Sequence, residues 1–246
     1  MILVSKHQKR LSMPKTWNVQ RKTHKWAVKA APGPHSRSKS IPLLLVMRDV
    51  LKLANSSKEA RKILHDGNVM VDGVVRRDYK FPIGVFDILT IPKMDVAYRV
   101  VLDRKQRLSL HKIGDSENKL CRIDNKTILK GGNIQLNLHD GSNIISDEYS
   151  YHTSDSVLLS VPDKKVVKHL VYKPGNLALI IGGTHSGELA TIMDVRKTRG
   201  SMPNMVSLKS GYDFETVEDY VYVVGKSEPE IEIPGVGGGV IDESDA

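Results

Sequence analysis

The pattern of hydrophobic and polar positions changes abruptly at residue 41. Residues 1–40 are rich in Lys, Arg, His, Ser and Pro, and their hydrophobic residues follow neither a helical nor a strand period. From Ile41, hydrophobic residues recur at helical spacing to about Ala54, and Pro42 stands where the first turn of a helix tolerates proline. The pattern therefore predicts an irregular N-terminal arm, followed by a helix that begins near Pro42.

A second, shorter helix and a β-hairpin follow. Ser56 and Glu59 have the spacing of a capping box, in which two side chains accept hydrogen bonds from backbone amides at the start of a helix. Gly67 is expected to end this helix as a left-handed cap. Residues 68–75 then have an Asp-Gly pair between two short hydrophobic runs, which is typical of a tight hairpin.

Residues 93–170 contain short β-type runs separated by turns, which predicts a small antiparallel sandwich or barrel. The runs are 98–102, 107–111, 134–138 and 156–161. The histidines of this region lack paired carboxylates or a nucleophile at useful spacing, so we expect them to face the surface or RNA rather than a catalytic site. They are His111, His139, His152 and His169.

Residues 172–192 combine two hydrophobic runs with a glycine-rich turn. Gly182, Gly183 and Gly187 allow positive backbone angles, so the segment is expected to form a hairpin with a tight loop. A phosphate-binding loop would need a Gly-Lys-Ser/Thr ending and a following helix, and neither is present. Nucleotide hydrolysis is therefore not supported.

The positive charge lies almost entirely in the arm. The chain of 246 residues has 37 Lys and Arg against 28 Asp and Glu, a formal net charge of +9. Ten of these bases and no acid lie in residues 1–40, so the rest of the chain is nearly neutral. Such an arm is typical of a tether to nucleic acid or to an anionic membrane. By itself it should be disordered, because it cannot bury a hydrophobic face.

The two tryptophans of the chain, Trp17 and Trp26, both lie in this arm. Indole rings can stack on RNA bases, or they can anchor an arm to its own protein. The sequence leaves both interpretations open.

Composition argues against several other classes of protein. The single cysteine, Cys121, cannot form an intrachain disulfide, and no Cys/His cluster has zinc spacing, so we expect a reducing cytosol and no metal. The longest aliphatic run, 43–47, is far shorter than the ~20 residues of a membrane span. Beyond Lys226 the chain has no base, which makes its end acidic.

The run from Ser57 to Gly73 resembles the alpha-L RNA-binding module. The shared features are the charged helix, the glycine, the Val-x-Val strand, the Asp-Gly turn and a closing Gly-Asp element, here Gly84 and Asp87 with two residues between them. In that family the positive helix face and the loop after the hairpin lie against RNA backbone. The resemblance therefore implies RNA contacts for Lys58, Arg61, Lys62, Arg76 and Arg77.

The hairpin of residues 172–192 resembles the KOW motif of ribosomal and transcription proteins, which lies within a small five-stranded barrel. Three bases follow it in a loop suited to phosphate contact: Arg196, Lys197 and Arg199.

The order of these parts, from Lys6 to about Gly225, resembles the small-subunit ribosomal protein S4e family of archaea and eukaryotes. The resemblance implies an α+β multi-domain protein. Its expected parts are a basic extended RNA-binding arm (1–41), an alpha-L RNA-binding module (42–92), a central β-rich domain (93–170), a KOW-type β-barrel (171–226) and an acidic C-terminal tail (227–246).

The implied function is that of a structural constituent of the small ribosomal subunit, without catalysis or a cofactor. The expected partners are small-subunit ribosomal RNA and neighbouring ribosomal proteins, in the cytoplasm, with no membrane and no homo-oligomer. The short chain and its acidic end favour an archaeal form. The candidate RNA-binding residues of the arm are Lys6, Lys9, Arg10, Lys15, Trp17, Arg21, Lys22, Lys25, His35, Arg37 and Lys39.

Two other classes stay open. An RNA-modifying enzyme can have an alpha-L module as an appendage, and a free transcription or translation factor can use a KOW barrel. Residues 93–170, which would have to hold the catalytic site, contain no Gly-rich dinucleotide or methyl-donor loop. A ribosomal protein would stay with washed small subunits, whereas a factor or an enzyme would leave them in high salt.

Overall fold

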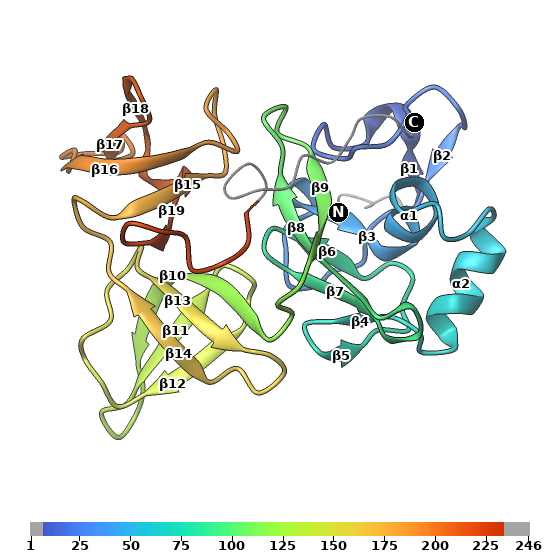
Figure 1. The fold of residues 1–246 in the computed structure, drawn as a ribbon, viewed down its shortest axis with the longest axis horizontal. Coiled ribbons are helices and arrows are strands. Elements are labelled where there is room, and N and C mark those ends of the chain that lie inside the picture. The colour runs from blue at the N-terminus through green and yellow to red at the C-terminus, as the bar shows by residue number, and fades with distance from the viewer. Residues whose placement is uncertain (1–6, 234–246) are drawn as a thin grey trace, which may run out of the picture.

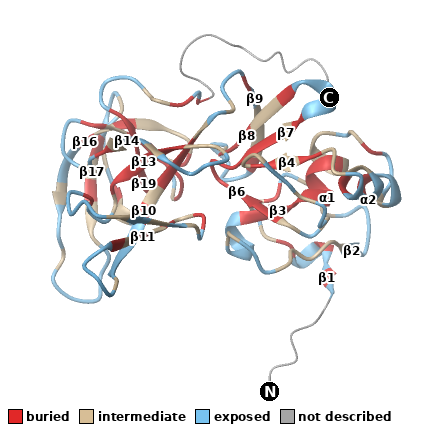
Figure 2. Ribbon diagram, turned by 90° about the horizontal axis from the view of Figure 1, so that it is seen from below, coloured by how far each residue is buried: buried red, intermediate tan, exposed pale blue. Residues whose placement is uncertain are grey.

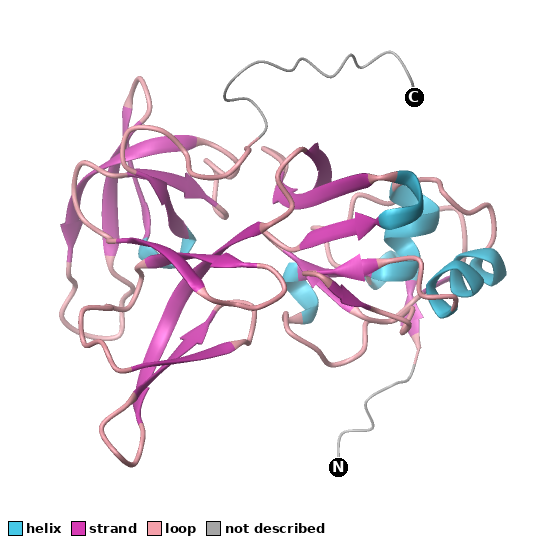
Figure 3. Cartoon of the chain, turned by 60° about the horizontal axis from the view of Figure 1, so that its bottom comes forward, coloured by secondary structure: helices cyan, strands magenta, loops and turns pink. Residues whose placement is uncertain are grey.

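The structure is a computed structural model of the chain, and it describes residues 7–233. A unit that contains both α-helices lies at one end of the molecule, and two β units lie together at the other end (Figure 1). Figure 3 shows this division directly, because α1 and α2 gather at one end while strands and loops dominate the rest. The protein is therefore mixed and rich in strands.

Residues 7–40 pack against the first unit. β1 (Gln8–Lys9) pairs antiparallel with β2 (Trp26–Ala27), and the carbonyl of Thr16 accepts a hydrogen bond from the Leu108 amide at 2.7 Å. The side chain of Met13 is buried in the core. The expectation of a disordered arm is therefore wrong for residues 7–40. Isolated hydrophobic residues anchor the arm, although they form no periodic pattern.

Two helices lie between the arm and the first large sheet. α1 (Leu43–Leu45) continues as a π-helical turn that ends at Val50, so the helix is shorter than predicted. α2 (Ser57–His65) begins at the predicted cap, where the Glu59 amide donates to Ser56 Oγ at 3.2 Å. The Glu59 carboxylate accepts from the amide of Asn55 at 2.9 Å, one residue earlier than in the standard capping box.

The first unit contains two sheets. The larger one has the strand order β5 (Val74–Val75), β4 (Met70–Val71), β7 (Ile88–Ile91), β8 (Val96–Leu102) and β9 (Leu108–Ile113). The smaller one pairs β3 (Ser40–Pro42) with β6 (Pro82–Gly84). A tight turn at 92–95 joins β7 directly to β8, with Ile91 opposite Val96. The predicted boundary between residues 92 and 93 therefore lies inside one continuous sheet.

The central unit is a second five-stranded antiparallel sheet. Its strand order is β12 (Asn143–Ser146), β11 (Ile134–Leu138), β10 (Asn118–Ile128), β13 (Ser156–Ser160) and β14 (Val166–Leu170). The register of β10 against β11 shifts between Ile123 and Asn125, so the first half of β10 pairs with β13 and the second half with β11. Cys121 and Ile123 of β10, together with residues of β11 and β13, form a small hydrophobic core of this unit's own.

The third unit is also a five-stranded sheet. Its order is β18 (Asp213–Val217), β17 (Met205–Lys209), β16 (Leu189–Arg196), β15 (Leu177–Ile180) and β19 (Val221–Gly225). The predicted glycine hairpin is β15–β16, and Gly183 and Gly187 have φ of +74° and +80°. Gly182 is required for a different reason, since a Cβ there would lie 2.6 Å from the Tyr220 ring.

One hydrophobic core joins the first and third units. Phe86 and Tyr222 meet there with ring centroids 5.7 Å apart, and buried residues line the inner sides of both sheets (Figure 2). Ile231 and Ile233 are each 5% exposed and belong to the same core. The predicted acidic tail therefore begins as a segment bound to the body, and residues 234–246 lie outside the described part of the chain. No helix among residues 7–233 is long and apolar enough to cross a membrane.

Candidate nucleic-acid interface

The exposed face of α2 presents three bases to solvent. Lys58, Arg61 and Lys62 are all exposed, while Ala60 and Leu64 on the opposite face are fully buried. The guanidinium of Arg61 lies 4.3 Å from the centroid of the Tyr79 ring. Stacking on an aromatic face leaves the N–H groups at the edge of the guanidinium available to an acceptor such as phosphate.

The loop after the β4–β5 hairpin repeats this arrangement. Arg76 lies 4.5 Å from the centroid of the Phe81 ring and is half-buried, and Arg77 beside it is exposed. The structure thus brings α2 and this loop together around Tyr79 and Phe81, two aromatic residues that we did not single out in the sequence.

The arm contributes a second group of exposed bases. Six of the predicted residues have exposed side chains: Lys9, Lys15, Lys22, Lys25, Arg37 and Lys39. Trp26 is 49% exposed, and Lys25 Nζ lies 5.4 Å from its ring centroid. Arg21 is half-buried and donates to the carbonyls of Leu11 at 3.2 Å and Pro14 at 3.0 Å, so part of its hydrogen-bonding capacity holds the arm's own backbone.

Arg10 and Trp17 are buried, and the prediction that they contact RNA is wrong for this conformation of the arm. Each is 2% exposed. Arg10 Nε donates to the carbonyl of Gln20 at 2.5 Å, and Trp17 Nε1 donates to the carbonyl of Ser40 at 2.5 Å. Both side chains therefore attach the arm to the body, which decides the question left open for Trp17.

His35 is a structural residue rather than an RNA-facing one. Its side chain is 5% exposed, and its Nε2 lies 2.9 Å from Asp87 Oδ2. The ring packs against Gly84, where a Cβ would lie 2.4 Å from His35 Cγ. Gly84 and Asp87 of the closing element thus contact the arm through His35. The sequence did not reveal this contact. The remaining arm candidate, Lys6, lies outside the described residues.

The third unit presents the predicted basic loop after β16. Arg196, Lys197 and Arg199 are all exposed. Arg196 Nη2 lies 3.5 Å from Glu215 Oε1, which partly neutralises it. Lys197 and Arg199 have the stronger potential for contact with an anion.

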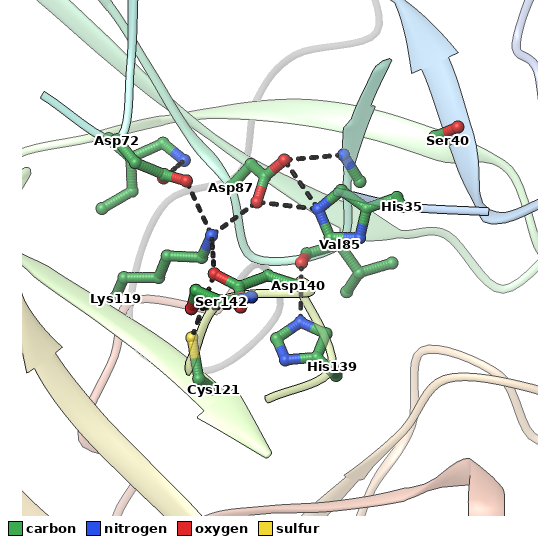
Figure 4. A network of polar contacts seen from close by, with 12 residues as sticks. His35, Ser40, Asp72, Val85, Asp87, Lys119, Cys121, His139, Asp140 and Ser142 are labelled. Atoms are coloured by element: carbon green, nitrogen blue, oxygen red, sulfur yellow. Dashed lines mark hydrogen bonds and ion pairs between the residues drawn. The ribbon is translucent and has the colours of Figure 1, made fainter. Parts of the chain in front are cut away.

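A buried lysine joins the first and central units (Figure 4). Lys119 Nζ on β10 lies 2.7 Å from Asp72, 2.7 Å from Asp87 and 3.0 Å from Asp140, and its side chain is 4% exposed. Asp72 belongs to the β4–β5 turn, and its other oxygen accepts from the Ile88 amide at 3.0 Å. The three carboxylates are far apart in sequence, so no local motif predicts the cluster.

The charges of this cluster shift one another's protonation. Burial would lower the pKa of Lys119, but Asp87 and the other acids hold that pKa well above its ordinary value. Burial would likewise raise the pKa of Asp87 and of Asp140, yet the charge of Lys119 keeps both below the ordinary range. Asp72 behaves differently, because burial and the negative charge of Asp87 raise its pKa despite Lys119.

His139 is half-buried and both its ring nitrogens contact the protein's own backbone, which corrects the expectation that it faces the surface or RNA. Its Nδ1 accepts from the Arg122 amide at 3.2 Å, and its Nε2 lies 3.3 Å from the carbonyl of Val85. Burial and the charge of Lys119 lower the pKa of His139 to about 4. His169 is partly buried and lies 2.7 Å from Asp155, whereas His152 is mostly exposed.

The described residues, 7–233, contain no group of three or more His, Cys, Asp or Glu side chains that could hold a metal ion.

Comparison with known proteins identifies similar chains over nearly the full length. Residues 4–38 match the RS4NT (NUC023) domain, and residues 94–166 match the ribosomal family S4e. A protein of Archaeoglobus fulgidus named small ribosomal subunit protein eS4 is 47% identical over 236 residues, which cover 96% of this chain and 100% of the relative. The protein of the same name from Methanocaldococcus jannaschii is 44% identical over 238 residues, covering 93% of this chain and 97% of the relative.

A solved structure supports the same relationship. The crystal structure of the 30S ribosomal protein S4e from Thermoplasma acidophilum matches with a TM-score of 0.68 at 37% identity, and the match covers 77% of this chain and 96% of that chain.

Proposed function

The chain belongs to the ribosomal S4e family, and on that premise we propose that it is a structural constituent of the small ribosomal subunit that binds ribosomal RNA. The observation that supports this most strongly is the similarity, over 96% of the chain, to a protein named small ribosomal subunit protein eS4. The resemblance inferred from the sequence is thereby confirmed at the level of the family, and its relatives are archaeal, as expected.

We propose further that the first unit is an alpha-L RNA-binding module and the third a KOW-type barrel. The capped helix α2, the Asp72-Gly73 turn and the basic loop at Arg76 and Arg77 support the first assignment. The β15–β16 hairpin within a five-stranded sheet supports the second. The domains would then be the arm, the first unit extended to residue 113, the central unit from 118 to 170, and the third unit from 171 to 226.

The proposed contacts with ribosomal RNA are the exposed face of α2, the loop after β5, the exposed bases of the arm and the loop after β16. Phosphate contacts made by Arg and Lys position a protein on RNA without reading its sequence, which suits a structural role. Ribosomal RNA and adjacent ribosomal proteins would be the partners, in the cytoplasm and without a homo-oligomer. The RNA-modifying enzyme and the free factor are not supported by the relatives.

Retention on ribosomal subunits tests this function. Purified protein is mixed with small subunits that lack it, and the complex is sedimented through high salt. We expect stoichiometric retention on the subunit. A protein that leaves the subunits quantitatively under salt that retains other subunit proteins would instead be a factor or an enzyme.

The α2 surface can be tested with a variant in which Lys58, Arg61 and Lys62 become Gln. These side chains are exposed, so the free energy of unfolding should change by no more than ~0.5 kcal/mol for each. The affinity for small-subunit ribosomal RNA should fall. Replacing three exposed lysines of the central unit, Lys130, Lys164 and Lys165, gives a control with the same change of net charge.

A further inference from the structure

The turn between β8 and β9 carries three bases that neither the motifs nor the proposed surfaces include. Arg104, Lys105 and Arg107 are all exposed, and they occupy three of four successive positions. Among residues 7–233, none of the three has a carboxylate within ion-pair distance of 4.0 Å. Asp103, the nearest acid in sequence, accepts from the Arg104 amide at 2.6 Å and so stabilises the turn.

The turn is held rigidly on two sides. The Asp103 amide donates to the Arg107 carbonyl at 2.8 Å, which closes the turn. On one side, Trp17 of the arm pairs with Leu108. On the other, Gln106 Nε2 donates to the carbonyl of Gly183 in the β15–β16 loop at 2.8 Å. Figure 1 shows this hairpin end standing between the arm and the third unit.

Arg107 completes one wall of a groove whose other wall is the arm. The groove has a volume of about 580 Å³, and its charged lining residues are Lys15, Arg21, Lys22 and Arg107, with no acid among the residues that line it. Four bases around this space attract an anion, because none of the residues that line it is acidic.

We propose that the β8–β9 turn is a further RNA-contacting element, and that Arg107 together with Lys15 and Lys22 holds the sugar-phosphate backbone of a ribosomal RNA strand in this groove. The proposal rests on the proposed function. The inference extends that function, because it joins the arm and the end of the first sheet into one continuous surface for RNA. Arg104 and Lys105, at the tip of the turn, extend that surface toward the third unit.

Salt-dependent binding to a small-subunit ribosomal RNA fragment tests the proposal. A variant with Arg104→Gln, Lys105→Gln and Arg107→Gln is compared with the unchanged protein and with a control, Lys130→Gln, Lys164→Gln and Lys165→Gln. Each lost phosphate contact lowers the slope of log affinity against log salt by ~0.7 to 0.9, so the turn variant, which loses three bases, should lose about two to three units of slope. The control should keep the slope of the unchanged protein.

Two outcomes overturn the proposal. If the turn variant and the control lose equal amounts of slope, net charge alone determines the salt dependence. If the turn variant keeps the slope of the unchanged protein, the turn contacts no RNA. If the turn variant binds the RNA fragment normally but no longer joins small subunits, the turn contacts a protein instead. Failure of the unchanged protein to bind RNA or subunits would refute the proposed function rather than this inference.

A position-specific measurement adds a direct readout. Cys121 is buried, so a Lys105→Cys variant offers one accessible thiol for a tethered iron chelate that cleaves nearby RNA backbone. We expect strand cleavage from position 105 and none from a Lys164→Cys control on the central unit. Absence of cleavage from position 105 in a complex that has formed would place the turn away from RNA.

Discussion

Lys119 Nζ lies 2.7 Å from Asp87 Oδ1, although 32 positions separate the two residues and they belong to different units. The second oxygen of Asp87 accepts from the Gly84 amide at 2.8 Å and also meets the arm through His35. One carboxylate therefore joins the arm, the first unit and the central unit. The Lys119 and Asp87 side chains are 4% and 2% exposed, so water cannot replace either partner.

Replacing Lys119 with Met should destabilise the protein by about 3–5 kcal/mol, because three carboxylates would lose their buried counter-charge. Denaturant unfolding, followed by circular dichroism, measures this change. Lys165→Ala is a matched control, since that side chain is 80% exposed and its contact with Asp163 is 3.9 Å long. The control should change stability by less than ~1 kcal/mol. A Lys119→Met protein as stable as the control would show that the cluster contributes little.

The same cluster predicts a stability maximum between acid and alkaline limits. The pKa values of Asp87 and Asp140 lie below the ordinary 3.8, so their stabilisation is present above that pH and is lost as the pH falls toward their folded pKa values. The pKa of Lys119 lies above the ordinary 10.5, so its contribution is full below that pH and is lost only at higher pH. Asp72, whose pKa is raised, opposes the first effect.

Denaturant midpoints between pH 2 and pH 7 measure the acid side of this maximum. Stability should fall as the pH drops below about 4, because two acids with lowered pKa values outweigh one whose pKa is raised. In Lys119→Met the fall should be shallower, since the charge that lowers both pKa values is gone. Parallel pH profiles for the two proteins would contradict this explanation.

Local features of the fold could be predicted from the sequence because their determinants lie close together in the chain. The cap at Ser56, the turn at Asp72 and the glycine hairpin at Gly183 and Gly187 each depend on a few neighbouring residues. The end of the first helix at Val50 could not be predicted in this way. Residues 43–47 are buried on all sides, so their hydrophobic pattern shows burial without showing where the helix ends.

For the candidate site, too, the success of prediction depended on how far apart the interacting residues lie in the sequence. Lys58 and Lys22 are exposed, as a contact with RNA requires, and that contact stays a prediction from charge and motif position. Arg10, Trp17 and His35 were misassigned because their partners, among them Ser40 and Asp87, are distant in sequence. Lys119 left only one signal, a lysine directly before the hydrophobic pair of residues 120–121, and that signal does not identify its three acidic partners.

The two tryptophans of the arm should now give different results. Trp17→Phe removes the donor for the buried Ser40 carbonyl, which should cost about 1–3 kcal/mol of stability. Trp26 is half-exposed, so Trp26→Ala should change stability little and weaken RNA binding by ~1–3 kcal/mol if its ring stacks on a base. Thermal unfolding and RNA titration of both variants separate the two roles. Unchanged RNA affinity in Trp26→Ala would leave that ring without a role in binding.

Two glycines with similar backbone angles offer a matched pair in the third unit. Gly175 and Gly187 have φ of +90° and +80°, so Ala at either position should cost ~1–2 kcal/mol in strain. A Cβ at Gly175 meets nothing within 4 Å, whereas one at Gly187 lies 3.1 Å from the Leu102 carbonyl oxygen. We therefore expect Gly187→Ala to cost about 1 kcal/mol more, as overpacking does. Equal stability losses would mean that the β8–β9 turn moves aside without cost.

The buried anchors of the arm determine how its contribution to RNA binding must be measured. Removing residues 1–40 would delete Met13, Trp17 and His35 together with the charges, and would expose the core that they cover. A loss of RNA affinity after such a deletion could then reflect unfolding. Substitutions confined to exposed bases avoid this, because they change charge and leave the anchors in place.

Replacing the six exposed bases of the arm with Gln should lower the salt dependence of RNA binding sharply. The residues are Lys9, Lys15, Lys22, Lys25, Arg37 and Lys39. Each phosphate contact releases counterions worth ~0.7 to 0.9 units of slope, so six contacts predict a loss of about four to five units. A salt titration on one ribosomal RNA fragment measures the slope, and an unchanged melting temperature confirms that the arm stays docked. Because the chain beyond residue 40 is nearly neutral, equal slopes before and after substitution would mean that the asymmetric charge of the arm serves a partner other than RNA.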